Sequence, residues 1–230
     1  MKLIVTTCDK YDWILPIFKF FYEKNWPDAP YQIKVLTETN VVDYPVFCAG
    51  KTSWASRLIK YLEQSGEDKI LFTLEDYLIK SEVNTARVRV AEKLCEGDVG
   101  YVRLSNGPYK YFKQHTAGYP TVGGFKQYPL HRRFSMVVHM GFFQKQFLLD
   151  VLKEGEDAWE TENNGSVRLG NLGSKWRVLW PEANIINYAS NGGLMKKGRL
   201  RPQTSKWARS ELLKSGEEGK ELHELIRGKG

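Results

Sequence analysis

The sequence predicts an α/β fold, a mostly parallel sheet flanked by helices, with a further helix at the C-terminal end. Short apolar runs rich in β-formers alternate with segments of helical periodicity over the first hundred residues. One run, at 69–74 (KILFTL), is largely apolar and bounded by charges, as buried parallel strands are. Because parallel strands end at one edge of a sheet, ligand-binding residues are expected at their carboxyl ends.

The first strand and helix follow directly from the N-terminal sequence. Residues 2–6 (KLIVT) form a β-rich run, and a polar segment follows at once, which predicts a strand that ends in a loop. A helix is expected from Trp13, capped by Asp12, because apolar residues then recur at helical spacing. Pro16 falls in its first turn, where a missing N–H costs little, and residues 25–28 (NWPD) end it.

The remaining elements are predicted in the same way. Further strands are expected at 32–36, 45–48, 69–74 and 99–104, and helices from Thr52 or Ser53 to Gly66 and at 83–94. Residues 105–133 lose this periodicity and predict a long excursion. After it we expect a strand at 134–139, helices at 142–152 and 157–168, strands at 177–180 and 185–188, a glycine-rich loop at 191–202 and a polar helix from about Ser205.

Composition excludes several classes of protein. Of the 230 residues, 42% are hydrophobic and 27% charged, which excludes disordered and collagen-like chains. No apolar run approaches the ~18 residues of a membrane span, and the N-terminus lacks the apolar core of a signal peptide. The three cysteines are widely spaced, so neither disulfides nor a zinc site is indicated. We expect a soluble cytoplasmic protein (in the host cytoplasm if viral), without stable membrane insertion or an obligate protein partner.

The positive charge is concentrated in two acid-free stretches. Residues 99–149 and 183–210 together hold thirteen lysines and arginines, so the rest of the chain carries a net charge of −6. This pattern favours an anionic partner, and the alternative is a solvated basic face. In the first stretch the cations alternate with Tyr and Phe, which suits a phosphate backbone and stacked bases, although aromatic rings also stack on sugars.

Two groups of carboxylates are candidates for chemistry. Glu75 and Asp76 follow the strand at 69–74 and suit Mg²⁺ or Mn²⁺ held partly by phosphate oxygens; alternatively they only end the strand. The segment 156–162 (EDAWETE) holds four acids beside a tryptophan, where a raised pKa suits a general base. Helix-start acids are the alternative for at least two of the four. Neither a G-x-G-x-x-G nor a P-loop motif occurs, so Rossmann-type and P-loop nucleotide binding are unsupported.

Several separated motifs together resemble small GT-A-type glycosyltransferases of bacteria and viruses, which use nucleotide sugars. The motifs are TTCDKYDWILPIFKFF, WASRL, KILFTLEDYLI, RFS, FFQKQFLLDVLK and EDAWETENNGS, and the resemblance spans residues 1 to about 188. It implies one GT-A-like domain at 1–190, with a nucleotide-sugar half at 1–104 and an acceptor half at 105–190. The basic loop and C-terminal helix at 191–230 are then expected to pack on it.

The resemblance also assigns residues to roles. For the nucleotide sugar it implies Thr6, Thr7, Asp9, Trp54, Arg57 and Glu75, and the loop cations Lys196 and Lys197 are candidates to close over the diphosphate. Asp76 is the expected ligand of Mn²⁺ or Mg²⁺, although the first Asp of the family's D-x-D motif is absent, which puts strict metal dependence in doubt. Glu160 or Glu162 is the expected base of an inverting transfer.

The acceptor is predicted from this sequence alone. The basic-aromatic stretch favours DNA that bears a hydroxymethylated pyrimidine, as in viral genome modification. Its candidate contacts are Lys110, Lys113, Arg132, Arg133, Arg199 and Arg201. Two alternatives stay open: a transferase acting on surface polysaccharide, lipopolysaccharide or glycoprotein, and a non-catalytic nucleic-acid-binding module.

Overall fold

The computed structural model describes residues 1–40, 42–107, 109–190 and 192–229, with the side chains of residues 109–111 excepted. Its strands are β1 (Leu3–Thr6), β2 (Ile33–Thr37), β3 (Val46–Cys48), β4 (Lys69–Leu74), β5 (Val99–Arg103), β6 (Thr121–Val122), β7 (Phe125–Gln127), β8 (Gly141–Gln144), β9 (Arg177–Pro181), β10 (Met195–Lys196) and β11 (Arg199–Leu200). Its α-helices are α1 (Leu15–Asn25), α2 (Trp54–Gln64), α3 (Thr85–Leu94), α4 (Tyr109–Thr116), α5 (Lys145–Val151), α6 (Ala158–Asn171), α7 (Pro202–Leu213) and α8 (Gly216–Arg227).

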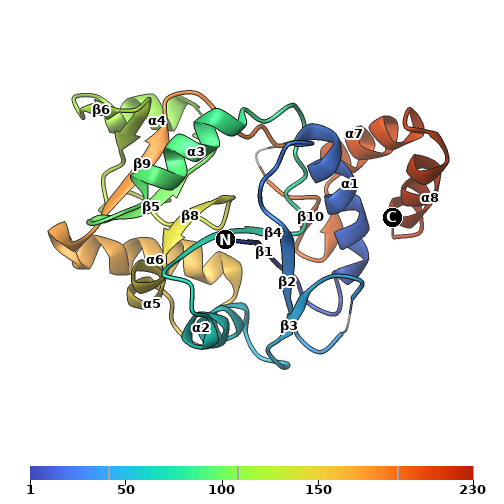
Figure 1. The fold of residues 1–230 in the computed structure, drawn as a ribbon, viewed down its shortest axis with the longest axis horizontal. Coiled ribbons are helices and arrows are strands. Elements are labelled where there is room, and N and C mark those ends of the chain that lie inside the picture. The colour runs from blue at the N-terminus through green and yellow to red at the C-terminus, as the bar shows by residue number, and fades with distance from the viewer. Residues whose placement is uncertain (41, 108, 191, 230) are drawn as a thin grey trace.

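One nine-stranded sheet organises the fold, in the order β3-β2-β1-β4-β8-β5-β9-β7-β6. The strands β3, β2, β1 and β4 pair in parallel, and β8 is inserted antiparallel between β4 and β5. Within this sheet only β8 and β7 run antiparallel to the other strands. The predicted class, a mostly parallel α/β sheet flanked by helices with a further helix at the C-terminal end, is confirmed, although two helices, α7 and α8, stand where one was predicted (Figure 1).

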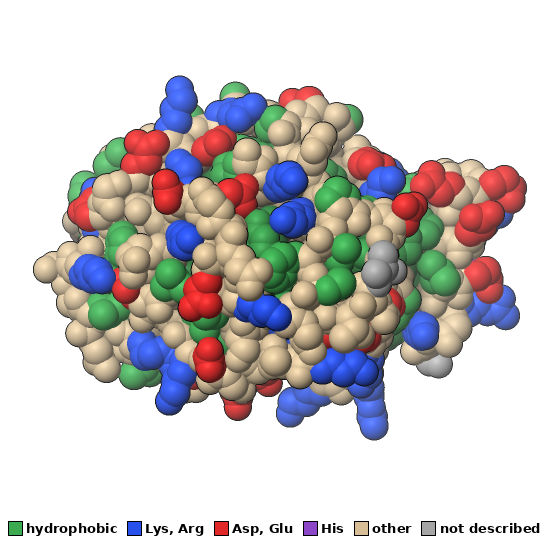
Figure 2. All heavy atoms as spheres, turned by 60° about the horizontal axis from the view of Figure 1, so that its bottom comes forward, with side chains coloured by type: hydrophobic (Ala, Val, Ile, Leu, Met, Phe, Trp, Pro, Cys, Tyr) green, Lys and Arg blue, Asp and Glu red, His purple; other side chains and the backbone are tan. Residues whose placement is uncertain are grey.

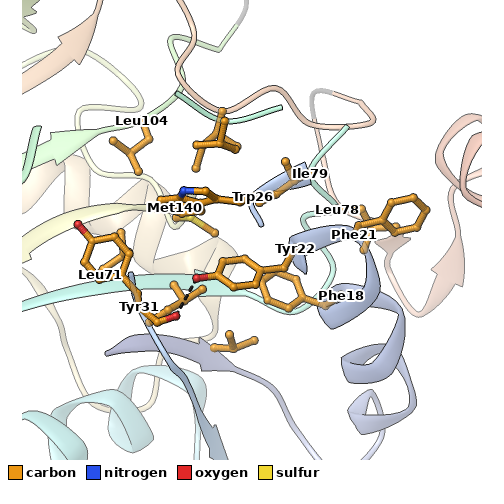
Figure 3. Close-up of a cluster of buried hydrophobic side chains, with 14 of the residues drawn as sticks. Phe18, Phe21, Tyr22, Trp26, Tyr31, Leu71, Leu78, Ile79, Leu104 and Met140 are labelled. Atoms are coloured by element: carbon orange, nitrogen blue, oxygen red, sulfur yellow. Dashed lines mark hydrogen bonds between the residues drawn. The ribbon is translucent and has the colours of Figure 1, made fainter. Parts of the chain in front are cut away.

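Helices cover both faces of the sheet (Figure 1). On one face α1, α3, α7 and α8 enclose a first core cluster, and on the other α2, α5 and α6 enclose a second. Figure 3 shows part of the first cluster, where Phe18 and Tyr22 of α1 and Trp26, which directly follows it, pack near Tyr31 and Leu71. The Tyr22 hydroxyl donates to the Tyr31 carbonyl over 2.8 Å, so its polar tip is satisfied inside an apolar core.

Strand order also locates the edge where a ligand is expected. From β1 the chain moves outward to β2 and β3 and then returns across β1 to β4. The carboxyl ends of β1 and β4 therefore lie side by side at the point where the strand order reverses. In open α/β sheets such a switch point leaves a crevice for ligands.

The helix caps and breaks predicted from the sequence are confirmed in part. Ser53 caps α2, since its Oγ accepts the backbone N–H of Ser56, and Pro16 lies in the first turn of α1. Asp12 does not cap α1; a turn of 3-10 helix (Asp12–Ile14) precedes the helix, and the Asp12 carboxylate instead accepts from the Asn40 side chain. The excursion predicted at 105–133 contains α4 and the β6–β7 hairpin.

Around residue 140 the prediction was wrong. Residues 134–139 form no strand, because the backbone N–H groups of Met136 and Val138 donate to the side chains of Ser166 and Glu162 on α6 rather than to another strand. The strand is β8, which takes the first residues of the helix predicted at 142–152. The strand predicted at 185–188 is reduced to a single bridge between Ile79 and Tyr188.

Across the described ranges, none of the helices combines the length and apolar character that crossing a membrane would require.

Candidate active site

A cavity of about 330 Å³ opens at the carboxyl ends of β1, β2 and β4, and we term it the strand-end cavity. Among the residues that line it are Thr6, Thr7, Cys8, Glu38, Trp54, Arg57, Glu75 and Asp76. Six of the predicted nucleotide-sugar and metal residues are therefore brought together here, from three separate segments of the chain. This follows from the sheet, since parallel strands deliver the residues after them to one edge.

A second cavity, of about 480 Å³, lies beside the first under the β10–β11 hairpin, and we term it the hairpin cavity. The residues lining both are Leu74, Asp76, Asp157, Ala158 and Met195, so the two cavities adjoin. The hairpin cavity adds, among others, Tyr77, Trp159, Glu162, Lys196, Lys197 and Arg201. Asp76 thus lies between the strand-end cavity and the hairpin cavity, and the hairpin cavity contains both a buried carboxylate and three cations.

Glu75 and Asp76 differ in their surroundings. Burial, and then the charge of Asp76, hold the pKa of Glu75 well above its usual value. Burial raises the pKa of Asp76 to about 6, opposed by a hydrogen bond from the Met195 N–H and by the charge of Arg201. That N–H lies 3.1 Å from Asp76 Oδ2, whereas Asp76 Oδ1 is buried with no hydrogen-bond partner among the described residues.

The orphaned Asp76 oxygen fits a divalent cation. A buried carboxylate oxygen without a donor is stabilised by a cation, and Mg²⁺ is commonly held by one or two carboxylates together with phosphate oxygens and water. Within the described residues no group of three or more His, Cys, Asp and Glu side chains is placed to hold a metal by itself. The residues present therefore suit a cation whose other ligands come from a substrate.

Arg57 is held by the protein rather than free to turn. Its Nη1 lies 3.0 Å from Glu38 Oε1 and donates to the Thr52 carbonyl, and its Nη2 donates to the Thr7 carbonyl. Sequence reasoning missed Glu38, although it follows β2 directly, as Glu75 follows β4. The strand-end rule that selected Glu75 applies equally to Glu38.

Of the acids at 156–162, Glu162 is the buried one that lines the hairpin cavity. Its Oε1 accepts the Val138 N–H over 2.9 Å. Burial raises the pKa of Glu162, an effect that this hydrogen bond and the charges of Arg103 and Arg133 oppose. A buried carboxylate with a raised pKa and an open space beside it is able to accept a proton.

The other three acids of that segment have structural partners. Asp157 and Glu160 form a capping box, in which each carboxylate accepts the backbone N–H of the other residue. Glu156 forms a two-pronged ion pair with Arg168. Glu160 lines neither cavity, whereas Glu162 lines the hairpin cavity. Of the two predicted bases, Glu162 is therefore the one placed beside an open space.

Asp9 likewise lies outside the residues that line the strand-end cavity. Its carboxylate accepts from the Thr39 hydroxyl and from the backbone N–H groups of Thr39 and Asn40. These hydrogen bonds, led by that of the Thr39 side chain, lower the pKa of Asp9 to about 2. In the described structure Asp9 joins the loop after β1 to the loop after β2.

The hairpin that carries Lys196 and Lys197 is anchored on Asp76. The Leu194 N–H donates to the Asp76 carbonyl, and the Met195 N–H donates to its carboxylate. Gly193 lies so close to this carboxylate that an added Cβ would overlap its atoms. Only glycine therefore allows the hairpin to cross Asp76 at this distance.

Replacing Gly193 with alanine is expected to lower the free energy of unfolding by about 1–3 kcal/mol, because the new methyl group forces the hairpin and Asp76 apart. Urea denaturation measures this change. Gly66→Ala is the matched control, since an added Cβ there meets open space. Equal stability of the two variants would contradict the described contact.

The predicted acceptor residues do not form one group. Arg201 lines the hairpin cavity and donates to the Met195 carbonyl. Arg133 stacks over the Phe134 ring and donates to Asn163 on α6. Lys113, Arg132 and Arg199 are exposed, and the side chain of Lys110 lies outside the described residues.

Solved structures share this architecture. The UDP-glucose pyrophosphorylase from Acinetobacter baumannii aligns with a TM-score of 0.58 at 10% identity over 99% of this chain and 98% of its own. The UTP-bound UGPase from the same organism aligns at 0.55 and 11% identity over 98% of each chain. The galactosyltransferase LgtC, solved with donor and acceptor sugar analogues, aligns at 0.41 and 13% identity over 78% of this chain and 73% of its own.

At such identities the likeness shows the fold alone, and the two pyrophosphorylase structures carry it. No protein-family model matches the chain. The search of curated proteins also gave no significant match.

Proposed function

We propose that this chain transfers a sugar from a nucleotide diphosphate sugar to an acceptor hydroxyl, assisted by Mn²⁺ or Mg²⁺. The observation that carries the proposal is the position of Asp76. Asp76 lines both the strand-end cavity and the hairpin cavity, which holds Glu162 and the cations Lys196, Lys197 and Arg201, and its buried Oδ1 has no hydrogen-bond partner among the described residues. In such a transfer we expect the diphosphate leaving group on one side of Asp76 and the base that activates the acceptor hydroxyl on the other.

The donor is assigned to the strand-end cavity. Thr6, Thr7, Trp54 and Arg57 provide hydroxyls, an indole and a guanidinium to the nucleoside, and Glu75 lies beside them. Burial raises the pKa of Glu75, so a protonated Glu75 is able to donate a hydrogen bond to a sugar or ribose oxygen. A cation on Asp76 would neutralise charge on the diphosphate as it leaves.

The chemical step is assigned to Glu162. Its carboxylate takes the proton of the acceptor hydroxyl while that oxygen attacks the anomeric carbon of the donor. The bond between the anomeric carbon and the diphosphate breaks, and its electron pair leaves with the nucleoside diphosphate. Lys196, Lys197 and Arg201 stabilise that leaving group. A single displacement of this kind inverts the anomeric centre.

Nucleotidyl transfer is the competing reaction for this fold. There a sugar phosphate attacks a nucleoside triphosphate, and the nucleophile is already ionised, so no base is required. Glu162 favours glycosyl transfer, because it is a buried carboxylate with raised pKa beside an open cavity. Release of pyrophosphate from UTP and glucose 1-phosphate would identify the competing reaction.

Donor binding is tested by isothermal titration with UDP-, GDP- and dTDP-sugars, with and without Mn²⁺. We expect at least one nucleotide to bind, and Mn²⁺ to strengthen its binding about tenfold or more, since the cation links Asp76 to the diphosphate. Asp9→Asn is a matched control, because Asp9 does not line the cavity. Absence of binding by every nucleotide would overturn the proposal and favour a non-catalytic module.

The DNA acceptor stays a sequence prediction. Two of the thirteen clustered cations contribute little to a basic surface, since Arg103 is buried and Lys126 pairs with Glu182. Figure 2 shows a face on which Lys and Arg side chains are interspersed with Asp and Glu. A gel shift on duplex DNA over a range of salt concentrations tests this acceptor, and a flat response would remove it.

A further inference from the structure

A third cavity, of about 430 Å³, is not used by the proposed reaction. It is lined in part by Ser105, His139, Asn184, Asn187 and Tyr188. These residues come from the segments that follow β5 and β9 and the segment that precedes β8. Because β8 runs antiparallel to β4 and β5, all of these segments lie at the same edge of the sheet as Asp76.

Hydrogen bonds hold the Asn184 and Asn187 side chains of the third cavity in place. Asn184 Oδ1 accepts the backbone N–H of Asn106 over 2.7 Å, and its amide nitrogen donates to Asn187 Oδ1. The Asn187 amide in turn donates to Ser81 Oγ. Each amide retains a donor hydrogen and an acceptor lone pair beyond these bonds, so the pair is oriented before any ligand arrives.

His139 adds a fixed neutral group. Arg103 Nη2 lies 2.7 Å from His139 Nδ1, and a guanidinium only donates, so Nδ1 is the acceptor of this bond. Burial, followed by the charge of Arg103, holds the pKa of His139 well below its usual value. The ring is therefore neutral with its proton on Nε2. The Tyr77 and Tyr188 rings pack against it, with centroids 4.5 and 5.5 Å away.

The lining chemistry selects a class of ligand. Lys80 is the one charged side chain among the described residues that line the cavity, and no carboxylate lines it. A phosphate backbone would meet a single cation there, and an apolar ligand would leave the amides unpaired. Hydroxyls that both donate and accept match the amides, Ser105 and the imidazole, and the Tyr188 ring offers an apolar face.

From this match we propose that the third cavity binds a saccharide unit of the acceptor, an inference that rests on the proposed sugar transfer. Tyr77 lines the hairpin cavity with Glu162, and its ring contacts His139 and Tyr188, which line the third cavity. The two cavities are therefore neighbours, joined by ring contacts between Tyr77 of the hairpin cavity and His139 and Tyr188 of the third cavity. A sugar in the third cavity leaves the next unit of the same chain to present its hydroxyl to Glu162.

The test begins with the labelled full-length chain on a glycan array of mono- to tetrasaccharides, followed by isothermal titration of the best-bound glycan. We expect Asn184→Ala and Asn187→Ala each to weaken glycan binding about tenfold, since each removes hydrogen-bonding groups from the exposed rim. Asn171→Ala is the matched control, because Asn171 is an exposed asparagine at the end of α6, outside the lining residues. Titration with UDP-sugars and Mn²⁺ should give the same affinity in all three variants.

Three results would overturn the assignment. The first is no glycan bound by the wild-type chain, and the second is glycan binding that neither Asn184→Ala nor Asn187→Ala weakens. The third is a hydroxymethylcytosine oligonucleotide that binds in place of glycans and is weakened by the same two variants, which would assign the cavity to nucleic acid. If glycans bind as expected while no nucleotide binds, the saccharide site stands and the proposed transfer fails.

Discussion

Replacing Asp76 with asparagine is expected to abolish sugar transfer. In the ligand-free protein the same change is expected to raise the free energy of unfolding by about 1–3 kcal/mol at about pH 8. The pKa of Asp76 is about 6 in the folded chain against an ordinary value of 3.8. The folded state therefore binds a proton more readily than the unfolded state between these values. Stability from this group is present below the lower value and is lost as the pH rises through the upper one. Asparagine carries no charge and avoids that loss.

Urea denaturation of both proteins at about pH 8 and about pH 4 measures the effect. The gain should be present at the higher pH and shrink at the lower one, where Asp76 is largely protonated. Asp9→Asn is the control of opposite sign, because hydrogen bonds from the loop after β2 lower the pKa of Asp9 to about 2. A variant of Asp76 that is both active and no more stable would contradict the role given to this carboxylate.

Replacing Glu162 with glutamine is expected to reduce the rate of transfer by about 100- to 10,000-fold while donor affinity is unchanged. The amide oxygen of glutamine still accepts the Val138 N–H, so the fold around α6 is retained, but the amide cannot take a proton. Burial raises the pKa of Glu162, and the carboxylate must be ionised to act as a base. Wild-type transfer should therefore decline as the pH falls through that raised value.

Steady-state rates with a fixed donor and acceptor over a pH series test this prediction. Glu160→Gln is the matched control, since Glu160 completes a capping box and lines neither cavity, and the transfer rate of this variant should stay close to wild type. Equal losses in the two variants, or a glutamine variant at position 162 with the wild-type pH profile, would count against Glu162 as the base.

The sequence predicted the sheet edge well because the relevant signals are local. A buried apolar run followed by polar residues identified the ends of β1 and β4, and those ends carry Thr6, Thr7, Glu75 and Asp76. The same rule reaches Glu38 once it is applied to the end of β2. These positions depend on the strand that precedes them and on parallel pairing.

The rest depends on contacts between distant segments. Residues 134–139 have the apolar pattern of a strand, yet Glu162 and Ser166 on α6 accept their backbone N–H groups in place of a neighbouring strand. Glu160 and Glu162 lie two residues apart, about half a turn of helix, so α6 directs the first to its N-terminal cap and the second to the cavity. The glycine at 193 is explained only by Asp76, more than a hundred residues away.

The most direct test of the central claim follows the products of a nucleotide sugar incubated with the chain, Mn²⁺ and the best-bound glycan. Proton and phosphorus NMR report the released nucleotide and the new glycosidic bond in one sample. The account predicts release of the nucleoside diphosphate, dependent on Asp76 and Glu162, with inversion at the anomeric carbon. Release of pyrophosphate from a nucleoside triphosphate and a sugar phosphate, with no diphosphate from any nucleotide sugar, would contradict it.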